Sequence, residues 1–482
     1  MAPAGVWFAV PVRMTGGSGV KRSLFVVLVT TVVLGVVAGP AWAGSPGVWQ
    51  KIGTDVGSSL PAPSAARTGD GYLHAVWSAQ AGAKAAYAHV RISPSGTVGS
   101  VAKIFTWGTL TWDPKILRNG AGLQVLFSGL YNTDPTHPLS KGAFYRTTAG
   151  KGGGSWSAPA RVGKWTYAYA NYGTGATLEG DGTPVVGGVL NSDSYWHVGT
   201  SAADADGQFT ISSGSLLDLS LATDAATGAV WASWYDLNKG GIWVRRIEPT
   251  LSAPQQAPGS VTKGSSITPD QAVAMVAPKG GGVYVAYCVG YPSCTSARLW
   301  KVGTSSTLTI PGTKYVRTLD LSVGPAGRIW AAWMSNTDDH VYAVRSNTKV
   351  SKFGAVRDLG QPQGGYVYKL DIEGSLGRGD VLVNAGSSGG INNIWHTQVL
   401  PGLTLTASPL KWNGGSAKTV TFTVRDAGAG LNGATVKVGT KSCKTGSTGT
   451  CKIAFGKLSP RKLTATATKA GYAKDALKLA VT

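Results

Sequence analysis

The side chains that could perform chemistry lie in four polar segments that separate apolar stretches of the chain. These segments combine carboxylates, imidazoles and aromatic rings, in the order Asp134, Asp193, Tyr195, Trp196, His197, Tyr235, Asp338, Asp339 and His340. Aromatic faces stack on sugar rings, and planar polar groups hydrogen-bond sugar hydroxyls. Two carboxylates could flank a glycosidic bond, whereas a tyrosine or histidine base could act beside a uronate. Polar loop residues also serve simply as turn formers, so both interpretations stay open.

A second group of carboxylates recurs at a similar place in successive apolar segments. Its members are Asp113, Asp218, Asp270, Asp320 and Asp371, with Asn171 in the corresponding place of another segment. One interpretation is a polar ring that binds a ligand or a cation, or supplies acid and base groups. The other is architectural, because an aspartate can accept backbone N–H bonds and fix the entry of a strand. The sequence shows no metal-ligand motif and indicates no cofactor.

A repeated unit must position these residues, and it recurs about seven times between Leu60 and Leu400. The clearest copies are GYLHAVW, GAVWASW and GRIWAAW, in which a tryptophan follows the turn glycine by six positions. Short alternating strands with a period of roughly 40–50 residues are typical of a β-propeller with one blade per repeat. We therefore expect an all-β, seven-bladed β-propeller over residues 44–402. The strand Val48–Gly57 should complete the last blade and close the ring.

Propeller geometry brings the two groups of polar residues together. The start of the first strand of a blade and the loop between its second and third strands share one face. Ligands bind where such loops surround a concave channel mouth, because loops can vary without disturbing the sheets. The candidate residues should therefore gather at one opening of the central channel.

Residues 403–482 form a distinct basic segment. It carries thirteen lysines and arginines against two aspartates, a net charge of +11 out of +21 for the whole chain. Its alternating strands predict a small β-sandwich. The motifs GATVKV (Gly433 to Val438) and ATKAGY (Ala467 to Tyr472) resemble small bacterial immunoglobulin-like or transthyretin-like modules of exported proteins. The charge could dock an anionic envelope polymer, or it could simply keep the segment soluble.

Residues 1–43 have the pattern of a secretion signal. Lys21 and Arg22 precede an apolar run, and the small residues Ala41 and Ala43 frame a cleavage site. Translation could also start at Met14, which would give a signal of more ordinary length. We therefore expect a mature protein that begins near Gly44 and is exported.

The four cysteines fit an oxidising compartment, because they fall into two close couples. Three connectivities are possible. Local pairing would join Cys288 to Cys294 and Cys443 to Cys451. Neither couple has the neighbours of a zinc site, so we expect structural disulfides.

The blade pattern resembles the sialidase-like, BNR-type propellers of exported bacterial proteins. The resemblance extends over about 340 residues as repeat architecture, and it implies a propeller that binds its ligand at one face. The first blade has no Arg-Ile-Pro motif, and the nearest approach to a Ser-x-Asp-x-Gly-x-x-Trp box is Asp204-x-Asp206-Gly207-x-Phe209. The resemblance therefore does not extend to sialidase activity.

Two functions are compatible with the sequence. The first is a secreted protein that binds extracellular or cell-envelope glycan through one propeller face, with the basic segment as an accessory domain. The second is a carbohydrate-active enzyme, a glycoside hydrolase or a polysaccharide lyase, with its site on the same face. The expected partner is an extracellular polysaccharide or an anionic cell-envelope polymer. We expect no nucleic-acid partner, no membrane span and a monomer located outside the cell or on its wall.

Overall fold

The computed structural model describes residues 47–56, 62–81, 84–106, 110–111, 113–130, 142–167, 170–190, 193–198, 209–212, 216–236, 238–260, 273–290, 294–363, 365–386 and 392–482. This part of the chain is all-β, and besides strands it contains a single turn of 3₁₀ helix, η1 (Pro325–Gly327). The expected secretion signal lies outside the described residues. Within the described ranges, no helix is long and apolar enough to cross a membrane.

Residues 50–399 form seven antiparallel sheets, most of them built from four consecutive strands. The first three sheets contain β2 (Ser64–Arg67), β3 (Leu73–Ala81), β4 (Lys84–Ile92) and β5 (Ala102–Thr106); β6 (Leu110–Thr111), β7 (Lys115–Asn119), β8 (Gly122–Leu130), β9 (Gly142–Ala149) and β10 (Ala160–Tyr167); and β11 (Ala170–Leu178), β12 (Pro184–Leu190), β13 (Asp193–Val198) and β14 (Phe209–Ser212). The next two contain β15 (Leu216–Thr223), β16 (Val230–Asp236), β17 (Ile242–Glu248) and β18 (Gln255–Gln256); and β19 (Val273–Val276), β20 (Tyr284–Val289), β21 (Ser296–Lys301) and β22 (Thr307–Thr309). The last two contain β23 (Val316–Val323), β24 (Ile329–Ser335), β25 (Val341–Arg345) and β26 (Arg357–Asp358); and β27 (Tyr366–Glu373), β28 (Gly379–Gly386), β29 (Asn392–Val399) and β1 (Gln50–Val56).

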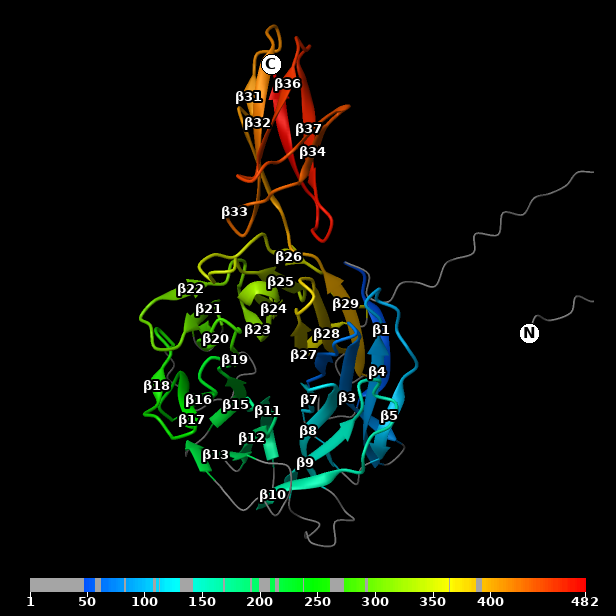
Figure 1. Ribbon diagram of the computed structural model, residues 1–482, viewed down its shortest axis with the longest axis vertical. Helices are drawn as coiled ribbons and strands as arrows, with labels where there is room; N and C mark the ends of the chain where they lie inside the picture. The colour runs from blue at the N-terminus through cyan, green and yellow to red at the C-terminus, as the bar shows by residue number, and fades with distance from the viewer. Residues whose placement is uncertain are drawn as a thin grey trace, which may run out of the picture. The chain divides into compact units, whose positions relative to one another are not determined.

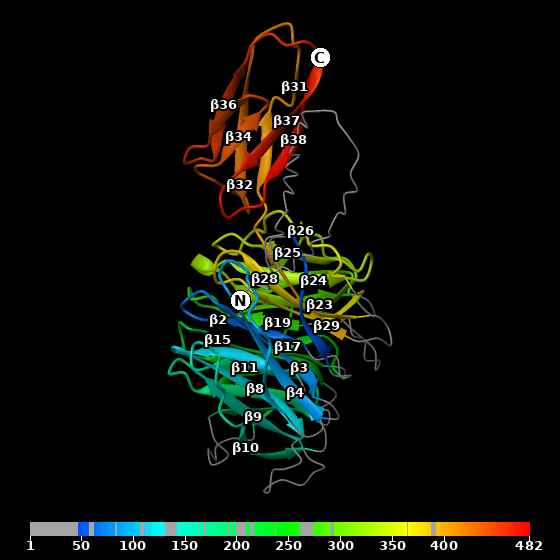
Figure 2. The ribbon, with the colours of Figure 1, turned by 90° about the vertical axis from the view of Figure 1, so that its right-hand side faces the viewer.

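The seven sheets stand around a common centre, as Figure 1 shows. Their innermost strands are β2, β7, β11, β15, β19, β23 and β27. Each of these strands contacts the innermost strand of the next sheet, and β27 contacts β2 again, which completes the circle. The perpendicular view in Figure 2 shows the strands of neighbouring sheets side by side. This arrangement is a β-propeller.

The first strand of the chain closes the circle. β1 pairs in antiparallel fashion with β29, so that Lys51 lies opposite Trp395 and Gly53 opposite Ile394. The prediction that the N-terminal strand completes the last sheet is confirmed. This pairing covers a sheet edge that would otherwise be free to pair with another chain.

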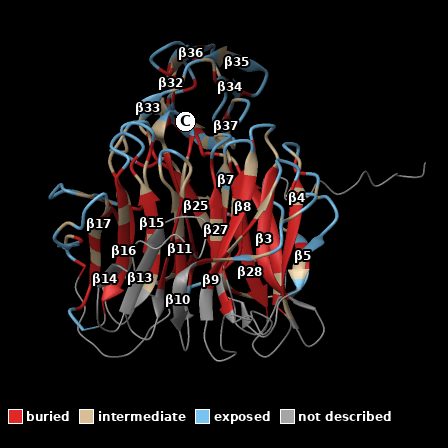
Figure 3. Cartoon of the chain, turned by 60° about the horizontal axis from the view of Figure 1, so that its bottom comes forward, coloured by how far each residue is buried: buried red, intermediate tan, exposed pale blue. Residues whose placement is uncertain are grey.

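The repeated glycine and tryptophan have separate structural roles. The turn glycines Gly71, Gly228 and Gly327 have φ values between +72° and +85°, a region that favours glycine over residues with a Cβ atom. The tryptophans six positions later are buried in the cores between adjacent sheets. Figure 3 shows that β3 and β16, which carry two of them, are largely buried. In β24, which is buried along its whole length, Trp333 belongs to the core shared with the preceding sheet and Trp330 to the core shared with the following one. Both faces of such strands are therefore apolar, unlike those of a half-exposed strand.

Residues 404–482 form two further sheets. One contains β30 (Thr404–Ser408), β32 (Lys418–Asp426), β33 (Ala429–Gly430) and β36 (Thr450–Phe455); the other contains β31 (Lys411–Trp412), β34 (Thr435–Val438), β35 (Lys441–Lys444), β37 (Arg461–Thr468) and β38 (Asp475–Val481). Apolar residues from both sheets, including Phe422 and Val436, belong to one core. Asp426 is almost fully buried and accepts hydrogen bonds from Arg345 in β25 (2.9 Å) and from the Tyr472 hydroxyl (3.0 Å).

Both disulfides pair locally, as predicted. Cys288 and Cys294 close the loop between β20 and β21. Cys443 in β35 joins Cys451 in β36, and this bond links the two C-terminal sheets. No free cysteine occurs.

Candidate functional site

The innermost strands present a repeated polar position to the channel. At this position Ser64, Ser220 and Asp320 accept a backbone N–H from the next sheet, donated by Ile116 (3.2 Å), Met275 (3.1 Å) and Ile372 (3.1 Å) respectively. Asp371 accepts the N–H of Ala65 in the same way. Each of these bonds joins two neighbouring sheets, so the architectural interpretation of the recurrent polar residue holds here.

The register corrects the expected equivalence of the five aspartates. Asp320 and Asp371 occupy the repeated position, whereas Asp218 and Asp113 lie two residues before its occupants Ser220 and Lys115. Asp218 sits at a β-bulge, because Leu217 pairs with Tyr235 while Leu219 pairs with Trp234, and its φ is +42°. An extra residue in a strand changes the direction in which the following side chains point. Alignment by sequence alone therefore matched Asp218 with Asp320, although Asp218 lies two residues before the repeated position.

The two deeper carboxyl groups form a coupled pair. Asp320 and Asp371 lie on adjacent innermost strands, close enough for the charge of one to shift the pKa of the other. Burial, and then the negative charge of Asp320, raise the pKa of Asp371 well above its ordinary value, and Lys115 opposes this shift. Burial likewise raises the pKa of Asp320. The pair therefore holds a proton at a pH at which a free aspartic acid would have lost it.

A second layer of charges lies closer to the strand starts. Lys369 Nζ is 3.8 Å from Asp218 Oδ1, across the channel. The Asp218 carboxylate raises the pKa of Lys369, burial opposes this, Asp113 raises it further and the nearby Arg317 lowers it. Asp113 Oδ1 accepts the N–H of Ala62 at 2.7 Å. The charges thus break the sevenfold symmetry of the sheets at this opening.

The enclosed space between these charges is small. Its volume is about 150 Å³, and it is lined by residues from six of the innermost strands and by Ala62, which precedes the seventh, β2. Binding sites for small molecules usually measure about 300–1,000 Å³. The channel is therefore smaller than a usual ligand site, and a ligand larger than this space would lie over the opening.

Sequence analysis missed a set of aromatic and basic residues at this opening. Arg317 lies over the ring of Tyr366, with its guanidinium carbon 4.2 Å from the ring centroid. The rings of Tyr366 and Tyr368 meet edge to face, with centroids 5.1 Å apart. Tyr315 is 43% exposed, and Lys314 lies 5.7 Å from its ring centroid. We call Tyr315, Arg317, Tyr366, Tyr368 and Lys369 the aromatic rim.

The signal for the aromatic rim was present as an internal repeat. The segments YVRTLD (Tyr315 to Asp320) and YVYKLD (Tyr366 to Asp371) match at four of six positions. Both segments carry a bulge after the valine, because the pairing register shifts between Val316 and Thr318 and between Val367 and Lys369. Tyr315 is the exposed residue of the repeat, whereas Arg317 and Tyr366 are half-buried, as the recurrent aspartates are.

In the loop after β24, Asn336 accepts a hydrogen bond from the Tyr366 hydroxyl of the aromatic rim (3.3 Å), but the carboxylates and the imidazole of this loop bond elsewhere. The carboxylate of Asp338 accepts hydrogen bonds from the Tyr342 hydroxyl and the backbone N–H of His340, and these outweigh burial and lower its pKa. His340 Nδ1 lies 2.9 Å from Asp358 Oδ1 in the outermost strand of the same sheet. Asp339 has a φ of +59° in the turn. These three candidates therefore make contacts within their own sheet.

Tyr235 was expected to contact a ligand, but the structure buries it. Only 1% of its surface is exposed, and it packs in the core between the sheets that contain β16 and β20. An apolar environment on both faces of β16 explains the difference, because the strand continues two residues further, to Asp236, than the loop pattern suggested. Tyr235 is a core residue and offers no free ring face.

Several predicted site residues cannot be placed. Asp134 and Asp270 lie outside the described residues. Asn171, Asp193, Tyr195, Trp196 and His197 belong to β11 or β13, but their side chains are outside the described set. Among the described residues, no group of three His, Cys, Asp or Glu side chains is placed to hold a metal ion.

Comparison with known proteins gives similar folds only. No protein-family model matches the chain, and no curated protein sequence matches it. Among solved structures, the chain is similar to the Hadza microbial sialidase Hz136, with 9% identity over 70% of this chain and 65% of that one and a TM-score of 0.45. It is also similar to a Penicillium chrysogenum alpha-L-arabinanase complexed with arabinobiose (12% identity, 73% and 97% coverage, TM-score 0.42) and to the polysaccharide lyase Uly1 (10%, 73% and 92%, 0.43). The chain thus spans slightly less than two thirds of the length of that sialidase.

Proposed function

We propose that this protein is an exported seven-bladed β-propeller, residues 44–402, with an immunoglobulin-like β-sandwich at residues 403–482, and that it binds an extracellular or cell-envelope glycan at the aromatic rim. The observation that carries the proposal is the stacked pair of Arg317 and Tyr366 beside Tyr368 and Lys369. The leader would be removed during export, and the mature protein would act as a monomer outside the cell.

The aromatic rim suits a sugar with an acidic substituent. Tyrosine rings offer apolar faces to the C–H surfaces of a sugar, and their hydroxyls hydrogen-bond its oxygens. The guanidinium of Arg317 presents a planar fork that matches a carboxylate. Lys369 adds a second positive charge, although Asp218 already neutralises part of it. The rim would therefore select acidic over neutral glycans.

Binding without turnover fits the carboxyl groups best. Asp320 and Asp371 accept backbone N–H bonds that join neighbouring sheets, and Asp338 and His340 are engaged within their own sheet. The alternative is a glycoside hydrolase or polysaccharide lyase on the same face. One observation favours it: the raised pKa of Asp371 keeps a proton that a general acid could donate.

A panel of acidic and neutral polysaccharides tests the proposal. Affinity electrophoresis measures binding, while reducing ends and the absorbance of unsaturated uronates measure turnover. Tyr366→Ala should weaken binding of an acidic glycan roughly 3- to 10-fold, because one aromatic contact contributes about 0.5–1.5 kcal/mol. Tyr72→Ala is the matched control, since Arg91 lies over Tyr72 (3.4 Å) in a turn of the first sheet.

Three outcomes would distinguish glycan binding at the aromatic rim from the enzyme alternative. Loss of binding in Tyr366→Ala but not in Tyr72→Ala supports the aromatic rim. Turnover that disappears in Asp371→Asn replaces the binding proposal by the enzyme. Equal binding by both tyrosine variants and the unaltered protein contradicts a glycan site at the rim.

A further inference from the structure

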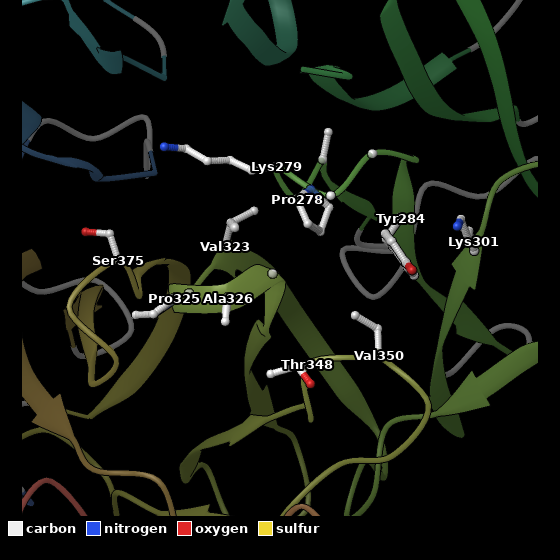
Figure 4. A pocket seen from close by; sticks show the side chains of 15 residues that line it. Pro278, Lys279, Tyr284, Lys301, Val323, Pro325, Ala326, Thr348, Val350 and Ser375 are labelled. Carbon is white, nitrogen blue, oxygen red and sulfur yellow. The ribbon is translucent and has the colours of Figure 1, made fainter. Parts of the chain in front are cut away.

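A cleft lies at the opposite end of the innermost strands. It measures about 850 Å³ and is formed by turns rather than by strands (Figure 4). The turns from β19 to β20 and from β23 to β24 supply its walls, with Ser375 from the turn after β27 and Val350 from the segment between β25 and β26. This volume falls within the range of functional binding sites.

Positive charge lies at both ends of this cleft. Figure 4 shows Lys279 extending towards Ser375 at one end and Lys301 beside Tyr284 at the other. Lys301 Nζ lies 5.8 Å from the centroid of the Tyr284 ring. No acidic residue is among the described residues that line the cleft. Two exposed ammonium groups without a lining carboxylate favour an anionic ligand long enough to reach both.

The floor between the two lysines is aliphatic and held in an unusual backbone conformation. It includes Pro278, Val323, Pro325 and Ala326. Ala326 has a φ of +57°, and Val350, which is β-branched, has a φ of +49°. Such values cost roughly 1–3 kcal/mol and persist where the surrounding structure holds them, often at ligand sites. The cleft is thus shaped by the fold before any ligand arrives.

We propose that this cleft binds a linear polyol-phosphate polymer, that is, alcohol units joined by phosphodiesters. Lysine ammonium groups act as compact point charges that bind phosphate oxygens, and no arginine, whose planar fork pairs with carboxylate or phosphate in a fixed geometry, is among the described lining residues. The flexible carbon chain of a polyol fits an aliphatic floor that offers few ring faces for sugar stacking. This site is separate from the aromatic rim and does not depend on the function proposed for it.

The basic C-terminal sheets extend the same surface. The segment between β25 and β26 lines the cleft through Thr348 and Val350. Its other end contacts the C-terminal sheets, because Gly354 lies against Ala427 and Lys352 against Gly428. Residues 403–482 carry a net charge of +11. A polymer that leaves the cleft at this side therefore meets further positive charge, which would lengthen its binding site.

Fluorescent poly(glycerol phosphate) is the probe for this proposal, and the full mature chain is titrated at several salt concentrations. The double variant Lys279→Gln with Lys301→Gln should bind about 25-fold more weakly at low salt, since each lysine near an anionic surface contributes about fivefold. The slope of log K against log[salt] should fall by about 0.7 per lysine, as for flexible single-stranded polyphosphates. Lys151→Gln, an exposed lysine in the segment between β9 and β10, is the matched control and should change neither value.

A second variant separates the cleft from general charge attraction. Val350→Gly keeps the positive φ and the net charge but removes part of the apolar lining, so it should weaken binding while leaving the salt slope unchanged. Equal binding by the double variant and Lys151→Gln would overturn the proposal. The proposal is also overturned if polygalacturonate or polyglutamate of matched charge binds the cleft as tightly as poly(glycerol phosphate) does. The ligand would then be a polyuronate or an acidic peptide. Tyr366→Ala should not affect poly(glycerol phosphate), which keeps this test independent of the aromatic rim.

Discussion

A buried histidine pair makes the first sheet sensitive to acid. His74 in β3 and His89 in β4 are 0% and 4% exposed, and their rings stack with centroids 5.2 Å apart. His74 Nδ1 lies 3.0 Å from His89 Nε2, and the edge of Trp156 covers His89. Burial lowers the pKa of His74 from 6.5 to about 4. Burial and the charge of its partner lower the pKa of His89 to about 3.

The direction of the pH effect follows from these values. The unfolded chain takes up protons below pH 6.5, whereas the folded pair stays neutral until about pH 4. Above pH 6.5 these neutral histidines therefore do not lower the free energy of unfolding, and this free energy falls as the pH falls towards 4. At pH 5 each buried histidine lowers the free energy of unfolding by about 2 kcal/mol, because one pKa unit corresponds to about 1.4 kcal/mol. Arg67 and Arg91 face the pair and oppose protonation, while Asp70 favours it.

We predict that His89→Gln halves this acid sensitivity. The glutamine amide can keep the hydrogen bond to His74 but cannot titrate. From pH 7.5 to pH 5, the pair should account for a loss of about 4 kcal/mol in the free energy of unfolding by urea, and the variant should lose about 2 kcal/mol less than the unaltered protein. His340→Gln is the control, because the His340 side chain is 37% exposed and pairs with an exposed Asp358.

Nuclear magnetic resonance measures the same quantity directly. The chain contains six histidines, so ¹³C-histidine labelling gives few enough signals to titrate individually. Two of them should remain neutral down to about pH 4, and one of these should vanish in His89→Gln. A native-state titration of either buried histidine near pH 6.5, or an unchanged pH dependence in the variant, would refute the reasoning.

Three further predictions concern the other buried charges. Arg67→Met should cost roughly 3–5 kcal/mol of unfolding free energy, measured by denaturant titration, because it leaves Glu373 and Asp380 buried without the guanidinium that bonds both. Asp371→Asn should raise the melting temperature increasingly from pH 5 to pH 8, because the unaltered carboxyl keeps a proton when folded and releases it when unfolded; a constant difference would contradict the raised pKa. Asp426→Asn weakens the bonds to two buried arginines, so hydrogen exchange should quicken in residues 425–430 while β8 and β16 keep their protection.

The periodic part of the fold could be predicted from the sequence, because it follows from local rules. Turn glycines such as Gly228 and buried tryptophans such as Trp234 recur at fixed spacing, and each position has the same role in its sheet. The disulfides join cysteines that are close in the sequence, whereas the pairing of the first strand with the last sheet follows from the need to close the ring. The recurrent aspartates were given both a structural and a ligand-binding interpretation, and Asp320, which accepts the Ile372 N–H of the next sheet, makes the contact that the structural one expects.

The parts of the candidate site that depend on three-dimensional register could not be predicted. The bulge at Asp218 moves its carboxylate two residues away from the repeated position, and Lys369 reaches it only because the ring brings distant strands together. Tyr235 stands in a polar-looking segment, yet the adjacent sheet covers it. The cleft between Lys279 and Lys301 arises from turns of two different sheets, and neither turn alone shows a motif.

The pairing of β1 with β29 determines the order in which parts of the fold can form during biosynthesis. Gly53 and Ile394 are partners although about 340 residues separate them. Closing so long a loop is entropically costly and slow compared with forming each local sheet. The earliest strand to leave the ribosome must therefore wait, unpaired, until almost the whole ring has emerged. During this delay both partner edges remain exposed, and an exposed strand edge can pair with neighbouring chains.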